Sequence, residues 1–145
     1  MDSEIAKQAA PVAPGIFTLP SRDAQPPALL GGHCTECDRR FFPQPMYCPQ
    51  CLGPLEKSSI GSRGRIYAFT VVRIKPPLGL PQPYAVGYID MEESGLRIFC
   101  LLDPRQVDRL EVGLDVVLAV DVLGHDGKGT PRLRPYFTPV KRQEC

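Results

Sequence analysis

The sequence contains only two histidines, His33 and His125, among its 145 residues. Neither has a partnered nucleophile, and His125 falls beside Asp126 in a glycine-rich turn, where a solvated hairpin tip explains the pair better than acid–base chemistry does. The glycines never form G-x-G-x-x-G ahead of a helix, and no P-loop with lysine is present. We therefore expect no catalytic residue and no nucleotide-binding loop, so the chain is not an enzyme by itself.

An excess of charge of either sign is also missing. Lysine and arginine total 17 and aspartate and glutamate 16, which leaves a formal net charge of +1. This balance provides no general attraction for nucleic acid, a membrane or an acidic partner. No apolar run approaches the roughly 18 residues of a membrane helix, and the start, residues 1–4, lacks a basic stretch followed by an apolar one. We expect a cytoplasmic protein without membrane contact.

Cysteine, in contrast, occurs six times, and four of the six form two pairs of identical spacing, Cys34-x2-Cys37 and Cys48-x2-Cys51. The segment between the pairs is long enough to fold back, so that the four thiolates meet at one tetrahedral metal site. Four thiolates leave no open coordination position, which makes the metal structural. The spacing predicts a zinc ribbon. A rubredoxin-type iron centre uses the same ligands, whereas a redox dithiol would need one pair only.

The neighbours of the cysteines complete this interpretation. Rubredoxin-like turns usually carry glycine after the second cysteine, but this chain has Asp38 and Leu52 there, and leucine tolerates a left-handed backbone less easily than aspartate. We interpret His33 as a polar residue beside a finished site and not as a fifth ligand. Cys100 and Cys145 remain as unpaired thiols, the first a buried structural thiol and the second mobile and inert.

Seventeen prolines divide the chain. Proline is frequent in residues 1–28, which predicts an extended arm that packs on another surface or stays disordered, with at most a short helix. The zinc ribbon follows, with Phe41, Phe42 and Tyr47 expected to cover the metal and dock it on the next domain. The predicted parts are the arm at 1–28, the ribbon at 29–60, an OB-fold domain at 61–140 and a tail at 141–145.

The second half of the chain alternates β-like runs with turns. The first run, Ile66–Ile74, is rich in β-branched and aromatic residues and follows Gly64. Between the third and fourth runs, Asp103 and Pro104 predict one helical turn, with Asp103 as its cap. Five strands with this insertion are typical of an OB-type barrel, so the fold is expected to be mostly β. The other four runs are 84–91, 96–102, 115–122 and 133–137.

Two surface features suggest binding. The proline-rich loop at 75–83 exposes leucine side chains, which indicates either a protein contact or a stiff connector. Four arginines flank the ribbon and the first strand, and they either meet CoA phosphates or are ordinary solvated side chains. We assign none of them as a CoA ligand. The four are Arg39, Arg40, Arg63 and Arg65.

Taken together, these parts resemble the acyl-CoA-associated OB-fold proteins with an N-terminal rubredoxin-like zinc ribbon. The resemblance covers roughly residues 29–137, and it departs from the family pattern before Cys34, where His33 replaces a commoner arginine. The motifs that carry it are Cys34-x2-Cys37, Phe42-Pro43, Cys48-Pro49-x-Cys51, the 64–72 strand, Pro83-Tyr84 and the 112–116 segment.

This resemblance implies an accessory subunit that completes or shapes the acyl-CoA site of a thiolase-type catalytic subunit in a hetero-oligomer, with a CoA thioester as the ligand of the complex. Within the family, the chain looks most like the small subunits of thiolases of anaerobic aromatic degradation, which cleave benzoylsuccinyl-CoA to benzoyl-CoA and succinyl-CoA. Family members generally do not carry the catalytic residues.

Zinc ribbons joined to OB barrels also occur in proteins that bind single-stranded nucleic acid, which need a basic groove with stacking aromatic residues. The strands of this chain supply aromatic candidates, although we expect these to lie in the core or the barrel wall, and the balanced charge disfavours this alternative. A third alternative, an iron-containing electron carrier, would use the same four cysteines. The aromatic candidates are Tyr67, Phe69, Tyr84, Tyr88 and Phe99.

Overall fold

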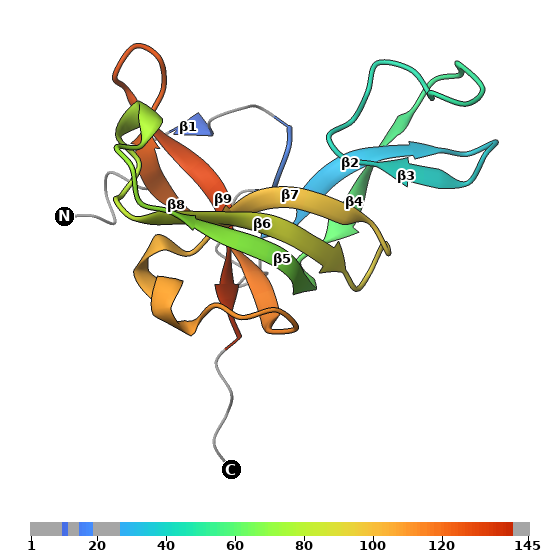
Figure 1. Cartoon of the computed structure of the whole chain (residues 1–145). Coiled ribbons are helices and arrows are strands. Elements are labelled where there is room, and N and C mark those ends of the chain that lie inside the picture. Colours follow the sequence, from blue (N-terminus) through green and yellow to red (C-terminus); the bar gives the residue numbers. More distant parts are fainter. Residues whose placement is uncertain (1–9, 12–14, 19–26, 141–145) are drawn as a thin grey trace.

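The computed structural model describes residues 10–11, 15–18 and 27–140, and most of them lie in β-strands (Figure 1). The strands form two sheets, and two short 3-10 turns, η1 (Pro77–Gly79) and η2 (Pro104–Arg109), lie in the loops of the larger one. The strands are β1 (Ala10–Pro11), β2 (Leu29–Cys34), β3 (Arg39–Phe41), β4 (Glu56–Gly61), β5 (Arg63–Val72), β6 (Tyr84–Met91), β7 (Arg97–Leu102), β8 (Asp115–His125) and β9 (Pro131–Pro139).

The larger sheet closes into a barrel. Its strand order is β1-β9-β7-β6-β5-β8, and β8 pairs with β9 as well, so the five strands β5 to β9 form a continuous ring. All pairs in this ring are antiparallel except β7 with β9, where Leu101 and Leu102 face Tyr136 and Phe137. The expectation of a mostly β fold, with a zinc ribbon ahead of a five-stranded OB-type barrel, is confirmed.

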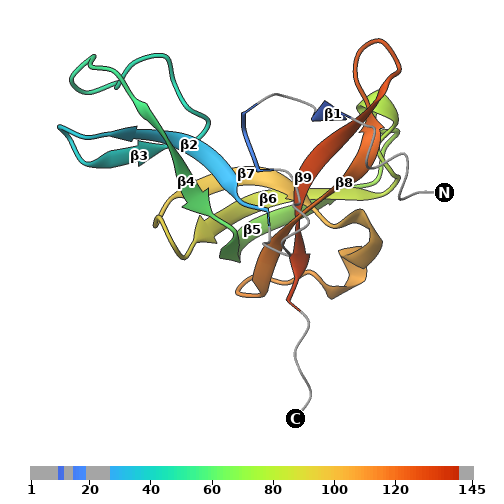
Figure 2. The ribbon, with the colours of Figure 1, turned by 180° about the vertical axis from the view of Figure 1, so that it is seen from behind.

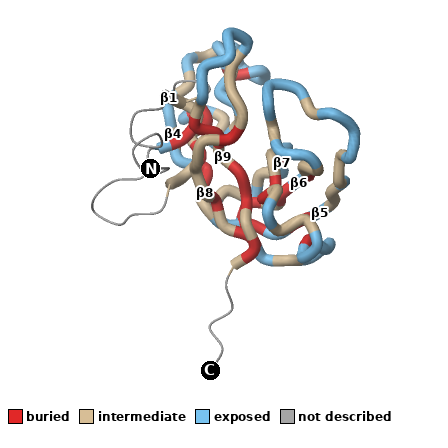
Figure 3. Tube along the Cα trace, turned by 90° about the vertical axis from the view of Figure 1, so that its left-hand side faces the viewer, coloured by how far each residue is buried: buried red, intermediate tan, exposed pale blue. Residues whose placement is uncertain are grey.

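Alternation along the strands builds the barrel core. In β6, residues at every second position from Ala85 to Met91 are buried, because successive side chains of a strand point to opposite faces. Ile66, Ile98 and Phe137 from three other strands join them. Figure 3 shows the buried positions in red along β6, β8 and β9. The five predicted strands are all present, although the first ends at Val72 and the fourth continues to His125.

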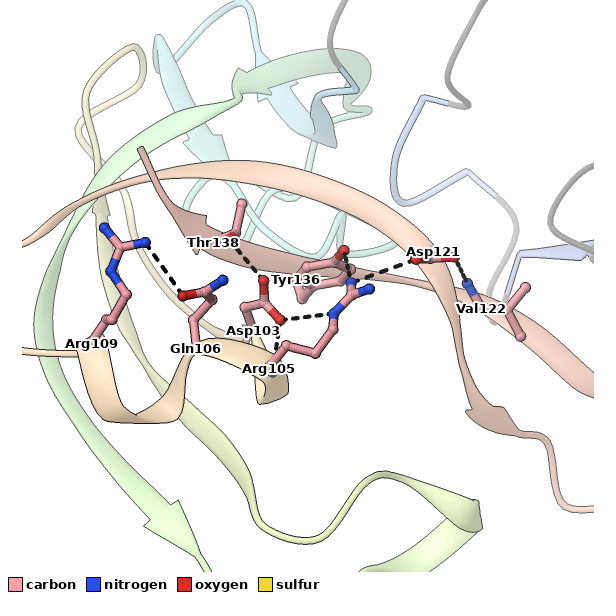
Figure 4. A network of polar contacts seen from close by, with 8 residues as sticks. All are labelled: Asp103, Arg105, Gln106, Arg109, Asp121, Val122, Tyr136 and Thr138. Atoms are coloured by element: carbon pink, nitrogen blue, oxygen red, sulfur yellow. Dashed lines mark hydrogen bonds and ion pairs between the residues drawn. The ribbon is translucent and has the colours of Figure 1, made fainter. Parts of the chain in front are cut away.

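The predicted helical turn is η2, and Asp103 anchors it as expected (Figure 4). The Asp103 carboxylate accepts a hydrogen bond from the Arg105 backbone N–H at 2.9 Å and another from the Thr138 hydroxyl at 2.8 Å. Arg105 in turn donates to the Tyr136 hydroxyl at 2.7 Å and lies 3.6 Å from the Asp121 carboxylate. This network fastens η2 to β8 and β9.

The smaller sheet, in the order β3-β2-β4, forms the ribbon. Its base belongs to the barrel core, because Leu29 and Ile60 are fully buried there. The turn between β6 and β7 stabilises the junction between the ribbon and the barrel. The Glu93 carboxylate in this turn accepts hydrogen bonds from the N–H groups of Ser62 and Arg63 at 2.8 and 3.1 Å. Although burial opposes it, these donors keep the pKa of Glu93 below its usual range.

The N-terminal residues that the structure describes pack on the chain itself. Ala10 and Pro11, which form β1, pair in parallel with Arg132 and Leu133 of β9 (Figure 2). Phe17 is buried in the barrel core. The predicted extended arm is therefore extended at these positions. The rest of the arm and the tail at 141–145 lie outside the described residues, and the domain boundaries stay predictions. Among residues 10–11, 15–18 and 27–140, no helix has the length and hydrophobicity that crossing a bilayer would need.

Candidate metal centre

The four paired cysteines come together at the far end of the ribbon. Their Sγ atoms all lie within 4.8 Å of one another, with Cys34 to Cys51 at 3.6 Å and Cys37 to Cys48 at 4.0 Å. A tetrahedral zinc ion with Zn–S bonds of about 2.3 Å requires sulfur atoms about 3.8 Å apart. All four are free thiols. The cysteines are thus positioned to bind a metal, and the donor set fits zinc.

Backbone geometry explains how the two turns aim their thiols. The N–H of Cys37 points to the Cys34 Sγ at 3.4 Å, and the N–H of Gly53 points to the Cys51 Sγ at the same distance. Each turn then reverses through a left-handed residue, Asp38 with φ of 53° and Leu52 with φ of 60°. Leucine adopts this conformation at a cost, so the second turn is strained at its exit.

The thiols affect one another's ionisation. Hydrogen bonds from the backbone N–H groups of Cys51 and Gln50 lower the pKa of Cys48 to about 7. The neighbouring Cys51 thiol, followed by burial, raises the pKa of Cys37 to about 12. Four thiolates this close repel one another, and a dication among them would favour the fully deprotonated set. The chemistry of the site is therefore that of a cation site.

The His33 side chain pairs with Asp38 and is not needed as a metal ligand. Its Nε2 lies 2.9 Å from the Asp38 Oδ1, and this hydrogen bond is the main cause that lowers the pKa of Asp38. The pair spans the first cysteine turn, from the last positions of β2 to the left-handed residue. His33 thus braces the turn, and four sulfur atoms complete the shell without it.

The other candidate residues lie away from this centre. The Cys100 side chain packs against the barrel core, and burial raises the pKa of its thiol to about 12, which fits the expected structural thiol. The His125 ring contacts the carbonyl of Asp126, with Nδ1 at 2.7 Å from the oxygen, in the β8–β9 hairpin. Cys145 lies outside the described residues.

One expectation about aromatic residues is wrong, namely that Tyr47 docks the metal centre on the next domain. Phe42 packs against the core as predicted, but Tyr47 is exposed together with Met46 and Leu52, so the second cysteine turn does not dock on the barrel. Strand aromatics were expected in the core or the barrel wall, and Phe69 is there. Three others, Tyr67, Tyr88 and Phe99, belong to the wall strands β5, β6 and β7, and their side chains are about half exposed on the outside of the barrel.

The sequence did contain a signal for these three rings. Each is adjacent to a buried isoleucine, in the pairs Ile66–Tyr67, Tyr88–Ile89 and Ile98–Phe99. Since neighbours in a strand face opposite sides, burial of the isoleucines places the aromatic rings outside. The sequence alone does not say which of the two faces of a strand is buried, so the rings could be assigned only to the core or the barrel wall.

The loop between β5 and β6 lies against β8 and the Leu78 side chain is partly exposed. The Gln82 side chain donates to the Arg73 carbonyl at 2.8 Å and closes the base of the loop. The loop is thus an ordered connector that still exposes the Leu78 side chain. The two interpretations of residues 75–83, a protein contact and a stiff connector, both stay predictions.

A ribbon with a four-cysteine centre joined to a closed OB-type barrel defines the class of this protein. Residues 22–56 match the family model described as the rubredoxin-like zinc ribbon domain of ChsH2, and residues 58–121 match its C-terminal OB-fold domain. The chain belongs to this family of paired ChsH2-type zinc-ribbon and OB-fold domains.

Individual relatives agree with this assignment. The benzoylsuccinyl-CoA thiolase subunit BbsA of Thauera aromatica is 36% identical over 91 residues, which are 62% of this chain and 61% of BbsA. The chain thus spans less than two thirds of that subunit. A DUF35 domain-containing scaffold protein of Methanothermobacter thermautotrophicus is 28% identical over 103 residues, which are 69% of this chain and 77% of that protein. Among solved structures, a chain of the Ltp2-ChsH2(DUF35) aldolase superposes with a TM-score of 0.61 at 26% identity and covers 77% of this chain and 84% of that one.

Proposed function

We propose that this chain is an accessory subunit of a thiolase-type enzyme, without catalytic residues of its own, and that it completes or shapes the acyl-CoA site of the complex. The observation that carries the proposal is the likeness to BbsA, a subunit of a thiolase, and to a chain of the Ltp2-ChsH2(DUF35) aldolase. BbsA is named as a subunit of a thiolase, and the aldolase is named for two components, Ltp2 and ChsH2. A shared domain pair supports a shared role as a partner-binding subunit.

The chemistry of the described residues supports the absence of a catalytic role. A metal held by four thiolates has no open position for water or substrate, so it would hold the ribbon together and activate nothing. The Cys100 thiol, with its pKa near 12, is a poor nucleophile at neutral pH. His125 is engaged with the backbone at a hairpin.

The finer part of the proposal concerns the reaction. By likeness to BbsA, the complex would act on a CoA thioester in the cytoplasm and cleave benzoylsuccinyl-CoA to benzoyl-CoA and succinyl-CoA in anaerobic aromatic degradation. The catalytic nucleophile and the acid–base residues would lie in the thiolase-type subunit. This chain would hold zinc through Cys34, Cys37, Cys48 and Cys51, and no residue of it is assigned as a CoA ligand.

Affinity purification of the tagged chain from its native cell extract tests this proposal. We expect a thiolase-type subunit in fixed stoichiometry, identified by mass spectrometry, and thiolysis of acyl-CoA that requires both chains. Metal analysis of the same sample should give one zinc ion per chain. Recovery of the chain without any thiolase-type protein, or full thiolytic activity of the partner alone, would contradict the proposal.

A further inference from the structure

Three aromatic side chains lie together on the outside of the barrel, on strands β5, β6 and β7, which run side by side in Figure 1. Tyr67, Tyr88 and Phe99 are 51%, 47% and 57% exposed. The outward face of a strand normally carries polar residues, because its other face fills the core. Large aromatic groups on three adjacent strands are therefore unexplained by the fold of this chain alone. We call these three residues the aromatic face.

The rings of the aromatic face are held in place before anything binds. Tyr88 and Phe99 are cross-strand neighbours, with ring centroids 5.2 Å apart and planes tilted by 60°. The Arg97 guanidinium lies 3.4 Å from the centre of the Tyr67 ring. The Asp90 carboxylate fixes that arginine through two hydrogen bonds, at 2.6 and 3.2 Å. Ordered aromatic groups lose little conformational entropy when a partner covers them.

The charged residues on this face disfavour binding of a polyanion such as nucleic acid, because they form ion pairs within the chain. A row of charged residues, Arg65, Asp90 and Arg97, crosses the three strands one step from the rings. Arg97 is paired with Asp90, and Arg65 is paired with Asp115 at 3.2 Å. Binding of single-stranded nucleic acid combines stacked bases with cations that meet the phosphates. Here the arginines beside the rings are already neutralised by carboxylates of the same chain.

Neutral, preordered aromatic groups with a fixed arginine fit the centre of a protein interface. Tyrosine and arginine are enriched among the residues that contribute most binding energy, and charged groups are depleted there unless paired. The face also lies on the half of the sheet nearer the ribbon, since the β6–β7 turn contacts the β4–β5 junction through Glu93. One partner could thus cover the aromatic face and the ribbon base together.

We infer that the aromatic face is the surface on which the thiolase-type subunit docks, through a neutral apolar segment that packs on Tyr67, Tyr88 and Phe99. This inference rests on the proposed function and adds to it the place of contact. Arg97 positions the Tyr67 ring, and its Asp90 partner keeps the interface free of an unpaired charge.

Binding measurements on the reconstituted complex test the inference. Tyr88→Thr and Phe99→Thr keep strand-forming residues but remove the rings, and we expect each to weaken the affinity for the thiolase-type subunit at least about tenfold. Ile74→Thr is the matched control, because it truncates an exposed apolar residue outside the face. Its affinity should equal that of the wild type. Zinc content and urea midpoints of all variants show that each is folded.

Footprinting of the unmutated complex provides a measurement that does not depend on variants. Hydroxyl-radical modification of Tyr67, Tyr88 and Phe99 should fall when the thiolase-type subunit binds. Unchanged modification of these rings, with normal affinity of both ring variants, would overturn the inference and leave the proposed function intact. A wild-type chain that binds no thiolase-type subunit would overturn both.

Two other occupants of the aromatic face, nucleic acid and a second copy of the chain, would give distinct results in binding and oligomerisation measurements. Binding of a labelled single-stranded oligonucleotide by the wild type, lost in Tyr88→Thr, would assign the face to nucleic acid and overturn the inference. A wild-type dimer that Phe99→Thr converts to monomer would assign it to a second copy of the chain, with the same consequence.

Discussion

Removal of the metal should unfold the ribbon and leave the barrel folded. Between Leu30 and Ser59 the buried residues are two glycines and the cysteines Cys34 and Cys48. The ribbon therefore has almost no apolar core of its own, and its two buried cysteines belong to the candidate metal centre. The barrel core has buried members from Phe17 to Phe137, and none of them lies between Leu30 and Ser59. Chelation thus removes the interior of the ribbon and leaves the core of the barrel unchanged.

A comparison of the backbone entropy with the free energy of zinc binding supports unfolding of the ribbon after chelation. Ordering the backbone costs about 1–2 kcal/mol per residue, so a segment of this length requires tens of kcal/mol of compensation. Structural zinc supplies about 10–16 kcal/mol in zinc-finger peptides at neutral pH. Hydrogen bonds within the small sheet and burial of two cysteines cannot replace a contribution of that size. Without metal, the unfolded state of the ribbon is therefore expected to be lower in free energy than its folded state by several kcal/mol.

Limited digestion with trypsin before and after chelation measures this effect. Arg39, Arg40 and Lys57 lie in the ribbon, and cleavage at these sites should accelerate at least about a hundredfold when the metal is removed. A fragment that begins near Arg63 should resist digestion throughout. Cys100→Ser, which changes a thiol outside the centre, should retain both the metal and the resistance. Equal protection of Arg40 and Lys57 with and without metal would refute the reasoning.

Three further predictions concern single residues. Asp103→Ala should lower the free energy of unfolding in urea by about 2–4 kcal/mol, because it removes a helix cap and leaves the Thr138 hydroxyl unpaired, whereas Asp103→Asn should cost about 1 kcal/mol. Backbone hydrogen bonds, first that of Thr130, lower the pKa of Asp126 to about 2, so its carboxylate stabilises the fold above pH 4 and this contribution disappears as the pH falls through about 2. The stability difference between wild type and Asp126→Asn should accordingly shrink from pH 4 to pH 2, and a constant difference would contradict this. Leu52→Gly should raise the zinc affinity or the stability of the ribbon by about 1 kcal/mol, measured by chelator competition, since glycine adopts the left-handed backbone without strain.

Local signals in the sequence predicted most of the elements. Alternating β-branched residues and turn residues located all five barrel strands, and Asp103 with Pro104 located η2. Errors occurred at strand ends, as at Ile74, which is exposed beyond the end of β5. Long-range pairing was not predictable in detail: the parallel contact of β7 with β9 depends on closure of the barrel, and no local pattern encodes it.

The metal centre was predictable because its geometry is set by short spacing. Two C-x2-C turns fix their thiols locally, and only the return of the chain between Cys37 and Cys48 had to be assumed. The aromatic face was not predicted, because alternation says that Tyr67 and Ile66 face opposite sides without saying which side is inside. The register shift between Ile66 and Ala68 also changes which residues of β5 face outward, and it appears only in the folded sheet.

The two parts of the chain are stabilised by different means, and this separates metal binding from partner binding. The ribbon would depend on a cation at the four thiols that are positioned to bind one, whereas the barrel that presents Tyr88 and Phe99 depends on its own apolar core. Loss of zinc should therefore remove any contacts that the ribbon makes and leave the aromatic face in place. The attachment proposed for the aromatic face should therefore survive removal of the metal, whereas the ribbon should lose its shape.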